Sequence, residues 1–314
     1  MNYERGYLKQ LEPIVREKEA EKKIFAFKAP NGIPVIFANG NSLAEAWENS
    51  LIALYYHGCN VKTQYDNPKD PPSIDCTMIM TIENPFAEPV IHRCFPGGLE
   101  DLEEYKQEVC DGIKDFLIGV HEESWQYTYH ERLKRYDVPG LGETIDQLKE
   151  VVEKLAEVPF TRRAQAITWQ PWKDNYIIDP PCLQRFWFRI LEINGEYYLN
   201  TNMDFRSRDA YKAAFMNDFA FIHLIKNVAE AIEEKLRKKG INKAVKLGRF
   251  VDKSDSYHIY GKDIQDFEKQ FIENLFKRNF QQRTWTLEFA NPFFEEAQSK
   301  IKENVDRLKA DTKK

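Results

Sequence analysis

Two consecutive prolines, Pro180 and Pro181, constrain the middle of this chain more than any other feature. Proline holds φ at about −65° and has no backbone N–H, so neither residue can lie within a central β-strand. The segment FWFRI at 186–190 is aromatic and β-branched, which predicts a strand soon after the prolines. Cys182 therefore lies at the stiff entrance of a predicted strand.

Cys182 has two interpretations at this point. Most cysteines outside disulfides are small buried apolar side chains, which would make Cys182 part of the core. A thiol held in a fixed position can also be a nucleophile. Taken alone, the stretch favours the structural interpretation, because a reactive thiol needs neighbours that stabilise the thiolate.

Helical and strand patterns are mixed along the chain without a strict β-α-β alternation. This arrangement predicts an α+β fold, with a mixed, largely antiparallel sheet packed by helices, in a single large domain. We expect a peripheral charged helix at 1–23 and the catalytic domain at 24–314. Ser42 is the predicted cap of a helix through residue 58, with Glu45 at the capping-box position. Further helices are expected at 99–118, 144–157, 210–237 and 262–276, and strands at 33–37, 76–83, 164–169, 197–202, 245–251 and 284–289.

Composition excludes several classes of function. The formal net charge of −5 argues against a protein that coats nucleic acid. No apolar run approaches the ~20 residues of a membrane helix, and the charged N-terminus does not resemble a signal peptide. The cysteines at 59, 76, 94, 110 and 182 form neither a CxxC pair nor a metal-ligand spacing, so we predict no metal site and a reducing, cytoplasmic location.

Two arginine clusters flank Cys182 in the chain. Arg162 and Arg163 precede a predicted strand, and the segment DFRSRD at 204–209 follows another. Guanidinium groups match phosphate oxygens in geometry and charge, so the clusters are candidates for a phosphate clamp. Further along, His258 and Tyr260 are two residues apart, which places their polar tips on one face of an extended segment.

The order of these motifs resembles that of the thymidylate synthase family and its pyrimidine hydroxymethylase relatives. The resemblance is carried by TRRAQAITW at 161–169, DPPC at 179–182, DFRSRDAYKAAFMNDFAF at 204–221 and SYHIYGKD at 256–263. Stretches within 24–140, such as DCTMIMTIENPFAEPVIHR, are similar to the divergent, archaeal-type branch. The resemblance implies a thymidylate synthase-like fold and a homodimer.

The resemblance also implies the roles of individual residues. Cys182 would be the nucleophile, and its pKa would fall beside Arg206, which reverses the interpretation drawn from the prolines alone. Glu104 or Glu108 would organise active-site waters, and Tyr129 would line the site. Four residues would bind the phosphate: Arg206 and Ser207, and Arg162 and Arg163 from a neighbouring subunit. Asp209 and Asn217 would bind the base. His258 and Tyr260 would bind the sugar 3′-hydroxyl.

The implied reaction is one-carbon transfer to C5 of a pyrimidine nucleoside monophosphate through a covalent adduct between Cys182 and C6. Methylation of dUMP with 5,10-methylenetetrahydrofolate, or a related reduced pterin, is the expected form. The alternatives are hydroxymethylation of dCMP, CMP or dUMP, and a nucleotide-binding protein that has lost the chemistry. Asn217 favours uracil, because its amide complements N3–H and O4, whereas the cytosine-specific relatives carry Asp at the matching position.

Overall fold

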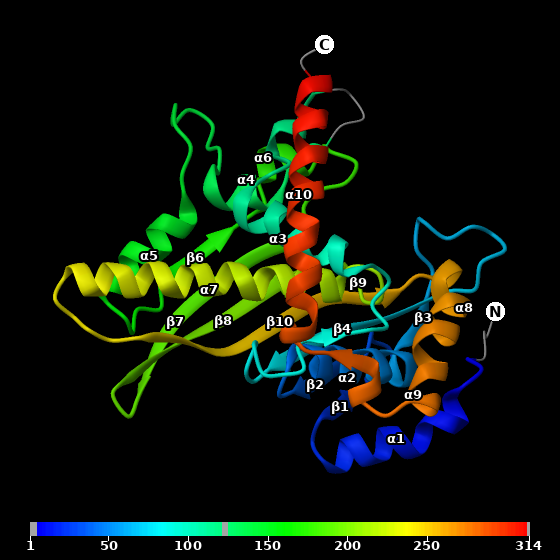
Figure 1. Cartoon of the computed structure of the whole chain (residues 1–314). Helices are drawn as coiled ribbons and strands as arrows, with labels where there is room; N and C mark the ends of the chain where they lie inside the picture. The colour runs from blue at the N-terminus through cyan, green and yellow to red at the C-terminus, as the bar shows by residue number, and fades with distance from the viewer. Residues whose placement is uncertain (1–4, 121–124, 313–314) are drawn as a thin grey trace. The chain divides into compact units, whose positions relative to one another are not determined.

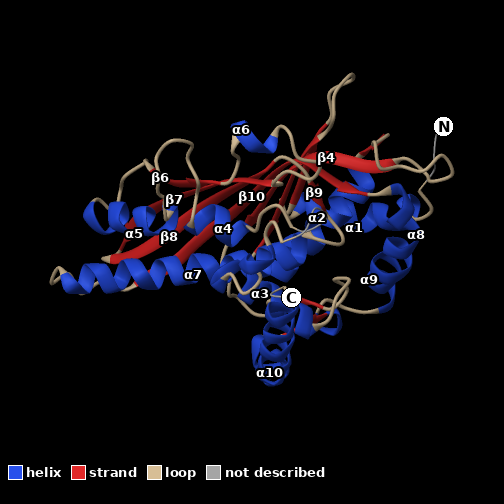
Figure 2. Cartoon of the chain, turned by 90° about the horizontal axis from the view of Figure 1, so that it is seen from above, coloured by secondary structure: helices blue, strands red, loops and turns tan. Residues whose placement is uncertain are grey.

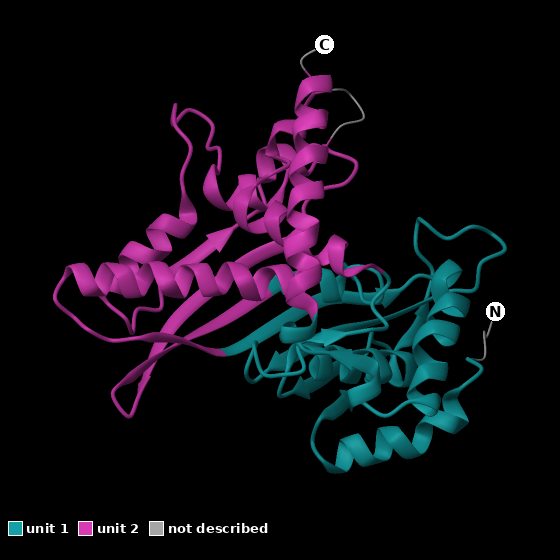
Figure 3. Ribbon diagram, in the orientation of Figure 1, with its two compact units in different colours: residues 1–96, 204–216, 249–289 teal, residues 97–203, 217–248, 290–314 magenta. Residues whose placement is uncertain are grey.

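The computed structural model describes residues 5–120 and 125–312. Their contacts divide the chain into two compact units, each built from three separate stretches (Figure 3). Unit 1 comprises residues 1–96, 204–216 and 249–289, and unit 2 comprises residues 97–203, 217–248 and 290–314. Because the stretches alternate along the chain, a single cut in the sequence would release neither unit.

The elements of unit 1 come from the N-terminal stretch, a short central stretch and residues 249–289 (Figure 1). They are α1 (Leu8–Ala20), β1 (Ile24–Phe27), β2 (Val35–Gly40), α2 (Leu43–His57), β3 (Cys59–Val61), β4 (Ser73–Ile82), β5 (Ile91–His92), β9 (Arg208–Asp209), most of β10 (Val245–Ile259), α8 (Ile264–Phe267), the π-helical turn Glu268–Ile272, α9 (Glu273–Lys277) and β11 (Thr284–Trp285).

Unit 2 holds the central elements and the last helix. They are α3 (Leu99–Asp111), the 3₁₀ turn Asp115–Leu117, α4 (Tyr129–Lys134), α5 (Gln147–Glu157), β6 (Ala164–Ile167), α6 (Pro171–Asp174), β7 (Leu183–Ile193), most of β8 (Glu196–Phe205), most of α7 (Ala214–Lys238) and most of α10 (Leu287–Asp311).

The sheet of unit 1 packs against helix α2, which is buried on nearly every side. Its strands follow the order β1-β2-β4-β10, with β2 parallel to β4 and the other two pairs antiparallel. In α2, every residue from Leu43 to Tyr55 except Glu45 is buried. Ser42 caps this helix by accepting from the backbone N–H of Glu45 at 3.3 Å, so the predicted cap is confirmed.

In unit 2, the antiparallel strands β6 and β7 and the neighbouring β8 carry helices α5 and α7. In both views, α7 runs along one face of β7 and β8 (Figure 1, Figure 2). The alternating pattern of β7 buries Phe186 and Phe188, and the ring of Phe186 lies 5.3 Å from that of Phe221 on α7. These phenylalanines therefore belong to the core, as the alternation predicts.

Two predicted elements need correction. The strand expected at 284–289 is limited to Thr284–Trp285, and α10 begins at Leu287, because Ala297, Ile301 and Val305 provide a helical apolar stripe. The helix expected at 99–118 ends at Asp111. Gly112 follows in the left-handed region, at φ 66°, where a Cβ would lie 2.2 Å from Nδ1 of His130.

The α+β class and the mixed, largely antiparallel sheet are confirmed. The charged N-terminal helix appears as α1, which packs against α2 and buries Leu11 and Val15. The domain boundary at residue 23 stays a prediction. Within 5–120 and 125–312, no helix has the length and apolar character needed to cross a bilayer.

Candidate active site

The strand entrance predicted for Cys182 is confirmed, because β7 begins at Leu183. Pro181 is buried and Cys182 is half-buried at the bend before the strand. The side-chain amide of Gln184 donates to the carbonyl oxygen of Pro181 at 2.8 Å. The backbone N–H of Leu183 donates to the hydroxyl of Tyr129 at 3.4 Å. Hydrogen bonds therefore hold the segment on both sides of the thiol.

Two tyrosines lie beside this segment. Tyr129 is the first residue of α4, and its ring centroid lies 5.8 Å from that of Tyr127 and 5.8 Å from that of Phe221. Burial, with smaller contributions from Tyr129 and Cys182, raises the pKa of Tyr127 well above its usual range. Tyr127 therefore keeps its phenolic proton near neutral pH and remains a hydrogen-bond donor.

Arg132, on the helix that begins at Tyr129, is fully buried with Asp174. The guanidinium donates twice to the carboxylate, at 3.0 and 2.7 Å, and once to the carbonyl oxygen of Thr168, at 3.0 Å. This bidentate pair joins α4 to α6. The guanidinium carbon of Arg132 also lies 5.5 Å from the ring centroid of Tyr127.

The two candidate glutamates of α3 share one lysine. Nζ of Lys114 lies 2.8 Å from Oε1 of Glu104 and 3.3 Å from Oε2 of Glu108. The same ammonium lies 5.5 Å from the ring centroid of Trp125. Burial is the main cause that raises the pKa of Glu108, and the charge of Glu104 adds to it, while Lys114 opposes both. Glu108 therefore holds a proton more readily than an exposed glutamate.

Asn217, the predicted reader of the base, has a partner on the same helix as the glutamates. Its Nδ2 donates to the hydroxyl of Tyr105 at 2.7 Å. This contact leaves the amide carbonyl and a second N–H of Asn217 to meet a ligand. Tyr105 thereby orients the side chain that the sequence singles out.

The remaining predicted residues of unit 2, Arg162 and Arg163, are exposed. They lie in the short connection before β6, where the indole N–H of Trp187 donates to the carbonyl oxygen of Arg162 at 3.0 Å. Their guanidinium groups are thus open to solvent on unit 2.

In unit 1, Arg206 and Ser207 are half-buried in the bend between β8 and β9. The next residue, Arg208, is buried and forms an ion pair with the buried Asp252 of β10. Arg208 also donates to the carbonyl oxygen of Ala214 at 2.9 Å, at the start of α7. Arg208 therefore supports the bend that carries Arg206.

Asp209 accepts two backbone hydrogen bonds at the turn after β9. The N–H groups of Tyr211 and Lys212 donate to Oδ1, at 3.0 and 2.8 Å. Burial raises the pKa of Asp209 to about 6, and the charge of Asp263 adds to the effect, while the two N–H donors oppose it. A carboxyl group that is protonated near pH 6 can donate as well as accept a hydrogen bond.

His258 and Tyr260 form the last predicted pair. Their ring centroids lie 4.5 Å apart in an edge-to-face arrangement, which confirms that the two side chains are neighbours. His258 is buried, and burial lowers its pKa, although the charge of Asp75 opposes this effect. In the parallel pairing of β9 with β10, His258 lies opposite Asp209.

The predicted residues are divided between the two units. Unit 2 holds Cys182, Tyr129, Glu104, Glu108, Asn217, Arg162 and Arg163, and unit 1 holds Arg206, Ser207, Asp209, His258 and Tyr260.

Comparison with known proteins identifies the family. The sequence profile described as thymidylate synthase matches residues 99–282. A protein of Methanocaldococcus jannaschii named "Putative thymidylate synthase" is 30% identical over 240 residues, which cover 74% of this chain and 95% of the relative. A protein of the same name from Methanosarcina acetivorans is 28% identical over 236 residues, covering 75% and 92%.

The chain belongs to the thymidylate synthase family. The solved structure of thermostable thymidylate synthase A from Bacillus subtilis matches with a TM-score of 0.53 and 17% identity, over 74% of this chain and 84% of that one. At this identity the match supports the fold alone, and it agrees with the α+β class described above. The protein is a thymidylate synthase-like enzyme.

Sequence reasoning missed several residues of the candidate site. Tyr105, Tyr127 and Lys114 contact predicted residues directly or lie beside them, and Arg208 supports the bend that carries Arg206. The sequence shows where these residues lie, within or near α3, before α4 and inside the RSR motif. It does not show which residue each of them contacts. The RSR motif gave no signal that its two arginines differ, because residues two apart in a strand share a face. Their roles separate only because Arg206 lies in the bend before β9.

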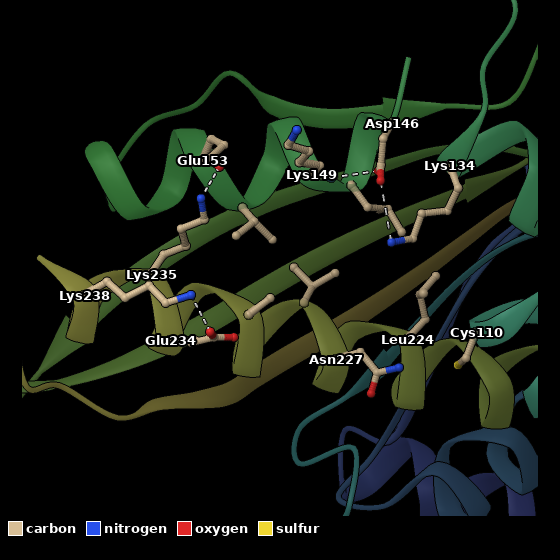
Figure 4. A pocket seen from close by; sticks show the side chains of 14 residues that line it. Cys110, Lys134, Asp146, Lys149, Glu153, Leu224, Asn227, Glu234, Lys235 and Lys238 are labelled. Atoms are coloured by element: carbon tan, nitrogen blue, oxygen red, sulfur yellow. Dashed lines mark hydrogen bonds and ion pairs between the residues drawn. The ribbon is translucent and has the colours of Figure 1, made fainter. Parts of the chain in front are cut away.

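A cavity of about 340 Å³ in unit 2 is separate from the predicted residues. It lies between α5 and α7 and is lined by apolar side chains such as Val152 and Leu224 (Figure 4). Charged pairs close its rim, including Lys235 with Glu153. Because these charged side chains neutralise one another, the rim has little net charge to attract a ligand. We therefore assign the cavity no role in the reaction. Across 5–120 and 125–312, the structure contains no group of three or more side chains suited to a metal ion.

The raised pKa of Asp209 makes folding stability depend on pH. With a folded-state pKa of about 6 against an ordinary value of about 3.9, the stability associated with the bound proton is complete below about pH 4 and is lost as the pH rises through 6. We expect Asp209→Asn to become more stable than the unmodified protein between about pH 4 and 7, by on the order of 2–3 kcal/mol at pH 7.

Urea unfolding at several pH values would measure the difference. Asp306→Asn on the exposed face of α10 is the matched control, and we expect it to show no such pH-dependent gain. A constant difference between Asp209→Asn and the unmodified protein across the range would contradict the assigned effect of burial.

Proposed function

We propose that this member of the thymidylate synthase family methylates dUMP at C5, through a covalent adduct between Cys182 and C6 of the base. The observation that carries the proposal is the position of Cys182 at the entrance of β7, beside the Tyr129 hydroxyl, within a unit that also holds an oriented Asn217. C5 of a pyrimidine is a poor nucleophile until a thiolate adds at C6.

The chain's own groups have separate tasks in this scheme. Cys182 adds to C6, and Asn217 holds the base through its carbonyl and remaining N–H. Tyr129 and the glutamate pair of α3 move protons at O4 and C5, with Glu108 suited to hold a proton because burial raises its pKa. Arg206 and Ser207 bind the phosphate, Asp209 contacts the base, and His258 and Tyr260 contact the sugar 3′-hydroxyl.

We propose 5,10-methylenetetrahydrofolate, or a related reduced pterin, as the second substrate. The residues around Lys114 fit a flat conjugated ring, since the ring of Trp125 stays 40% exposed close to Glu104 and Glu108. Such a donor supplies the one-carbon unit and, for a methyl product, a hydride. A hydroxymethyl product would arise if water took the place of the hydride.

Mass analysis of the products from dUMP, dCMP, UMP and CMP with methylenetetrahydrofolate tests the reaction. A gain of a methyl group on dUMP supports the proposal. A hydroxymethyl product on any of the four would establish the hydroxymethylase alternative, and binding without turnover would establish a nucleotide-binding protein. The prediction of a cytoplasmic location rests on the five scattered cysteines, and that of no nucleic-acid partner on the net charge of −5.

Replacing the nucleophile should stop the reaction at its first step. We expect Cys182→Ser to lower the rate by several orders of magnitude while nucleotide binding stays nearly intact, because a hydroxyl is a far weaker nucleophile than a thiolate. Release of tritium from C5-labelled dUMP measures the step directly. Cys110→Ala is the matched control, and we expect close to the unmodified rate. More than a tenth of that rate in Cys182→Ser would remove the thiol from the mechanism.

Base preference should follow the Asn217 amide. A mismatched buried polar pair costs about 1–3 kcal/mol, so we expect a roughly ten- to hundredfold preference in kcat/KM for dUMP over dCMP. Asn217→Asp should shift this preference toward cytosine. Asn227→Asp, at an exposed position on the same helix, is the control that should leave the ratio unchanged. Equal kcat/KM for both nucleotides in the unmodified protein would refute the assignment.

We propose a homodimer in which Arg162 and Arg163 bind the phosphate held by the partner subunit. Their exposed positions on unit 2 are compatible with this role. Mixing inactive Arg162→Ala and Cys182→Ser proteins should restore part of the activity, because one kind of hybrid site then has every group it needs. A monomer that stays active at high dilution would exclude the shared site.

A further inference from the structure

Three side chains of unit 1 form a hydrogen-bonded series that ends in a buried, unsatisfied nitrogen. The hydroxyl of Ser256 donates to Oδ2 of Asp75 at 2.6 Å, and Nδ1 of His258 lies 3.3 Å from that hydroxyl. Nδ1 also lies 3.3 Å from the carbonyl oxygen of Ser256. Nε2 of His258, on the other side of the ring, is buried and has no hydrogen-bond partner among the residues that the structure describes.

We propose that Asp75, acting through Ser256, is a positioning residue that keeps the proton of His258 on Nδ1, so that Nε2 accepts a hydrogen bond from a hydroxyl group of the substrate. The inference rests on the proposed function, because the hydroxyl in question is the 3′-hydroxyl of the nucleotide sugar.

The sheet explains how the three residues meet. Strand β10 is antiparallel to β4, and His258 lies directly opposite Asp75. The register shifts between Ser254 and Tyr257, which marks a bulge at Asp255 and Ser256. A bulge turns a side chain away from the regular alternation, and here it brings the hydroxyl of Ser256 to the carboxylate. Without the bulge, a strand with His258 opposite Asp75 would place Ser256 opposite Thr77, two residues away from Asp75 on β4.

Counting donors and acceptors fixes the tautomer. A carbonyl oxygen can only accept, so the contact between Nδ1 and the Ser256 carbonyl requires the proton on Nδ1. Because the hydroxyl proton of Ser256 goes to Asp75, the hydroxyl oxygen is left as a second acceptor for the same N–H. Without Asp75, the hydroxyl could turn and donate to Nδ1, which would move the ring proton to Nε2.

The tautomer has a consequence for recognition. A neutral imidazole with its proton on Nδ1 has an accepting lone pair on Nε2, and a buried acceptor needs a donor. His258 is only 5% exposed, so water is a poor substitute for that donor. A sugar hydroxyl supplies the O–H, whereas a sugar that lacks the 3′-hydroxyl leaves Nε2 unsatisfied. The direction of this one hydrogen bond thereby contributes to specificity.

The first measurement requires no substrate. Nitrogen NMR of protein labelled in its histidine rings should show Nδ1 protonated and Nε2 unprotonated for His258, with His258→Gln used to assign the signal. In Asp75→Ala, we expect a mixture of the two tautomers, because the freed hydroxyl of Ser256 can then donate to Nδ1. The double variant Asp75→Ala, Ser256→Ala removes that hydroxyl and keeps the backbone carbonyl, so it should return to the Nδ1 tautomer. Ser256→Thr retains the hydroxyl and should keep the single tautomer. Protonated Nε2 in the unmodified protein would overturn the proposal.

The second measurement compares dUMP with its 2′,3′-dideoxy analogue. We expect the unmodified enzyme to prefer dUMP by about three- to tenfold in kcat/KM, the value of one hydrogen bond between neutral groups. Asp75→Ala should reduce this ratio toward one, and the double variant Asp75→Ala, Ser256→Ala should recover it. A purely structural role for Asp75 would lower both substrates equally and keep the ratio, which would overturn the proposal. Asp75→Ala should have no further effect on the ratio in a His258→Ala background.

Asp66→Ala is the matched control. Asp66 accepts from the hydroxyl of Ser73 at 3.1 Å in the same unit, so this variant also breaks a contact between an aspartate and a serine, but no histidine follows in the series. The ratio should stay at the unmodified value. If the unmodified protein shows the Nδ1 tautomer but does not turn over dUMP, the proposed function fails while the arrangement of Asp75, Ser256 and His258 stands.

Discussion

The ion pair between Arg208 and Asp252 is the interaction on which the bend that carries Arg206 and Asp209 in unit 1 depends. Both side chains are buried, and removing one partner of such a pair leaves an uncompensated charge at a cost of about 3–5 kcal/mol. Arg208 also binds the carbonyl oxygen of Ala214, where α7 begins. One guanidinium therefore connects β9, β10 and the start of α7. The positions of Arg206 and Asp209, on either side of it, follow from this anchor.

The pKa values of buried acids in this protein shift in opposite directions, depending on their partners. Glu48 is buried in α2, but His92 and Arg283 bind both of its oxygens, and the pKa of its carboxyl falls to about 2. Asp209 and Glu108 are also removed from water, yet their partners do not compensate fully, and their pKa values rise. The fully paired acid stabilises the core. Acids that stay partly unsatisfied can exchange protons with a substrate near neutral pH.

Much of the fold followed from local patterns in the sequence. The cap at Ser42, the alternation of β7 and the strand entrance after Pro181 depend on residues close together in the chain. The strand predicted at 284–289 failed because aromatic and β-branched residues suit a strand locally, while the apolar stripe of α10 extends well beyond them. Tertiary packing of that stripe overrides the local preference.

The sequence by itself determined which chemical groups the protein has. It also placed Cys182 at the entrance of a strand and two arginines in the RSR segment. The rigidity of two prolines and the geometry of guanidinium groups are local properties, so they can be recognised without a fold. Only the tertiary structure decided the partners. Tyr105 binds Asn217 across 112 residues, and Asp75 binds Ser256 across 181 residues. Such pairs depend on helix packing and strand register, and a shift of one residue in register would point each side chain to the opposite face.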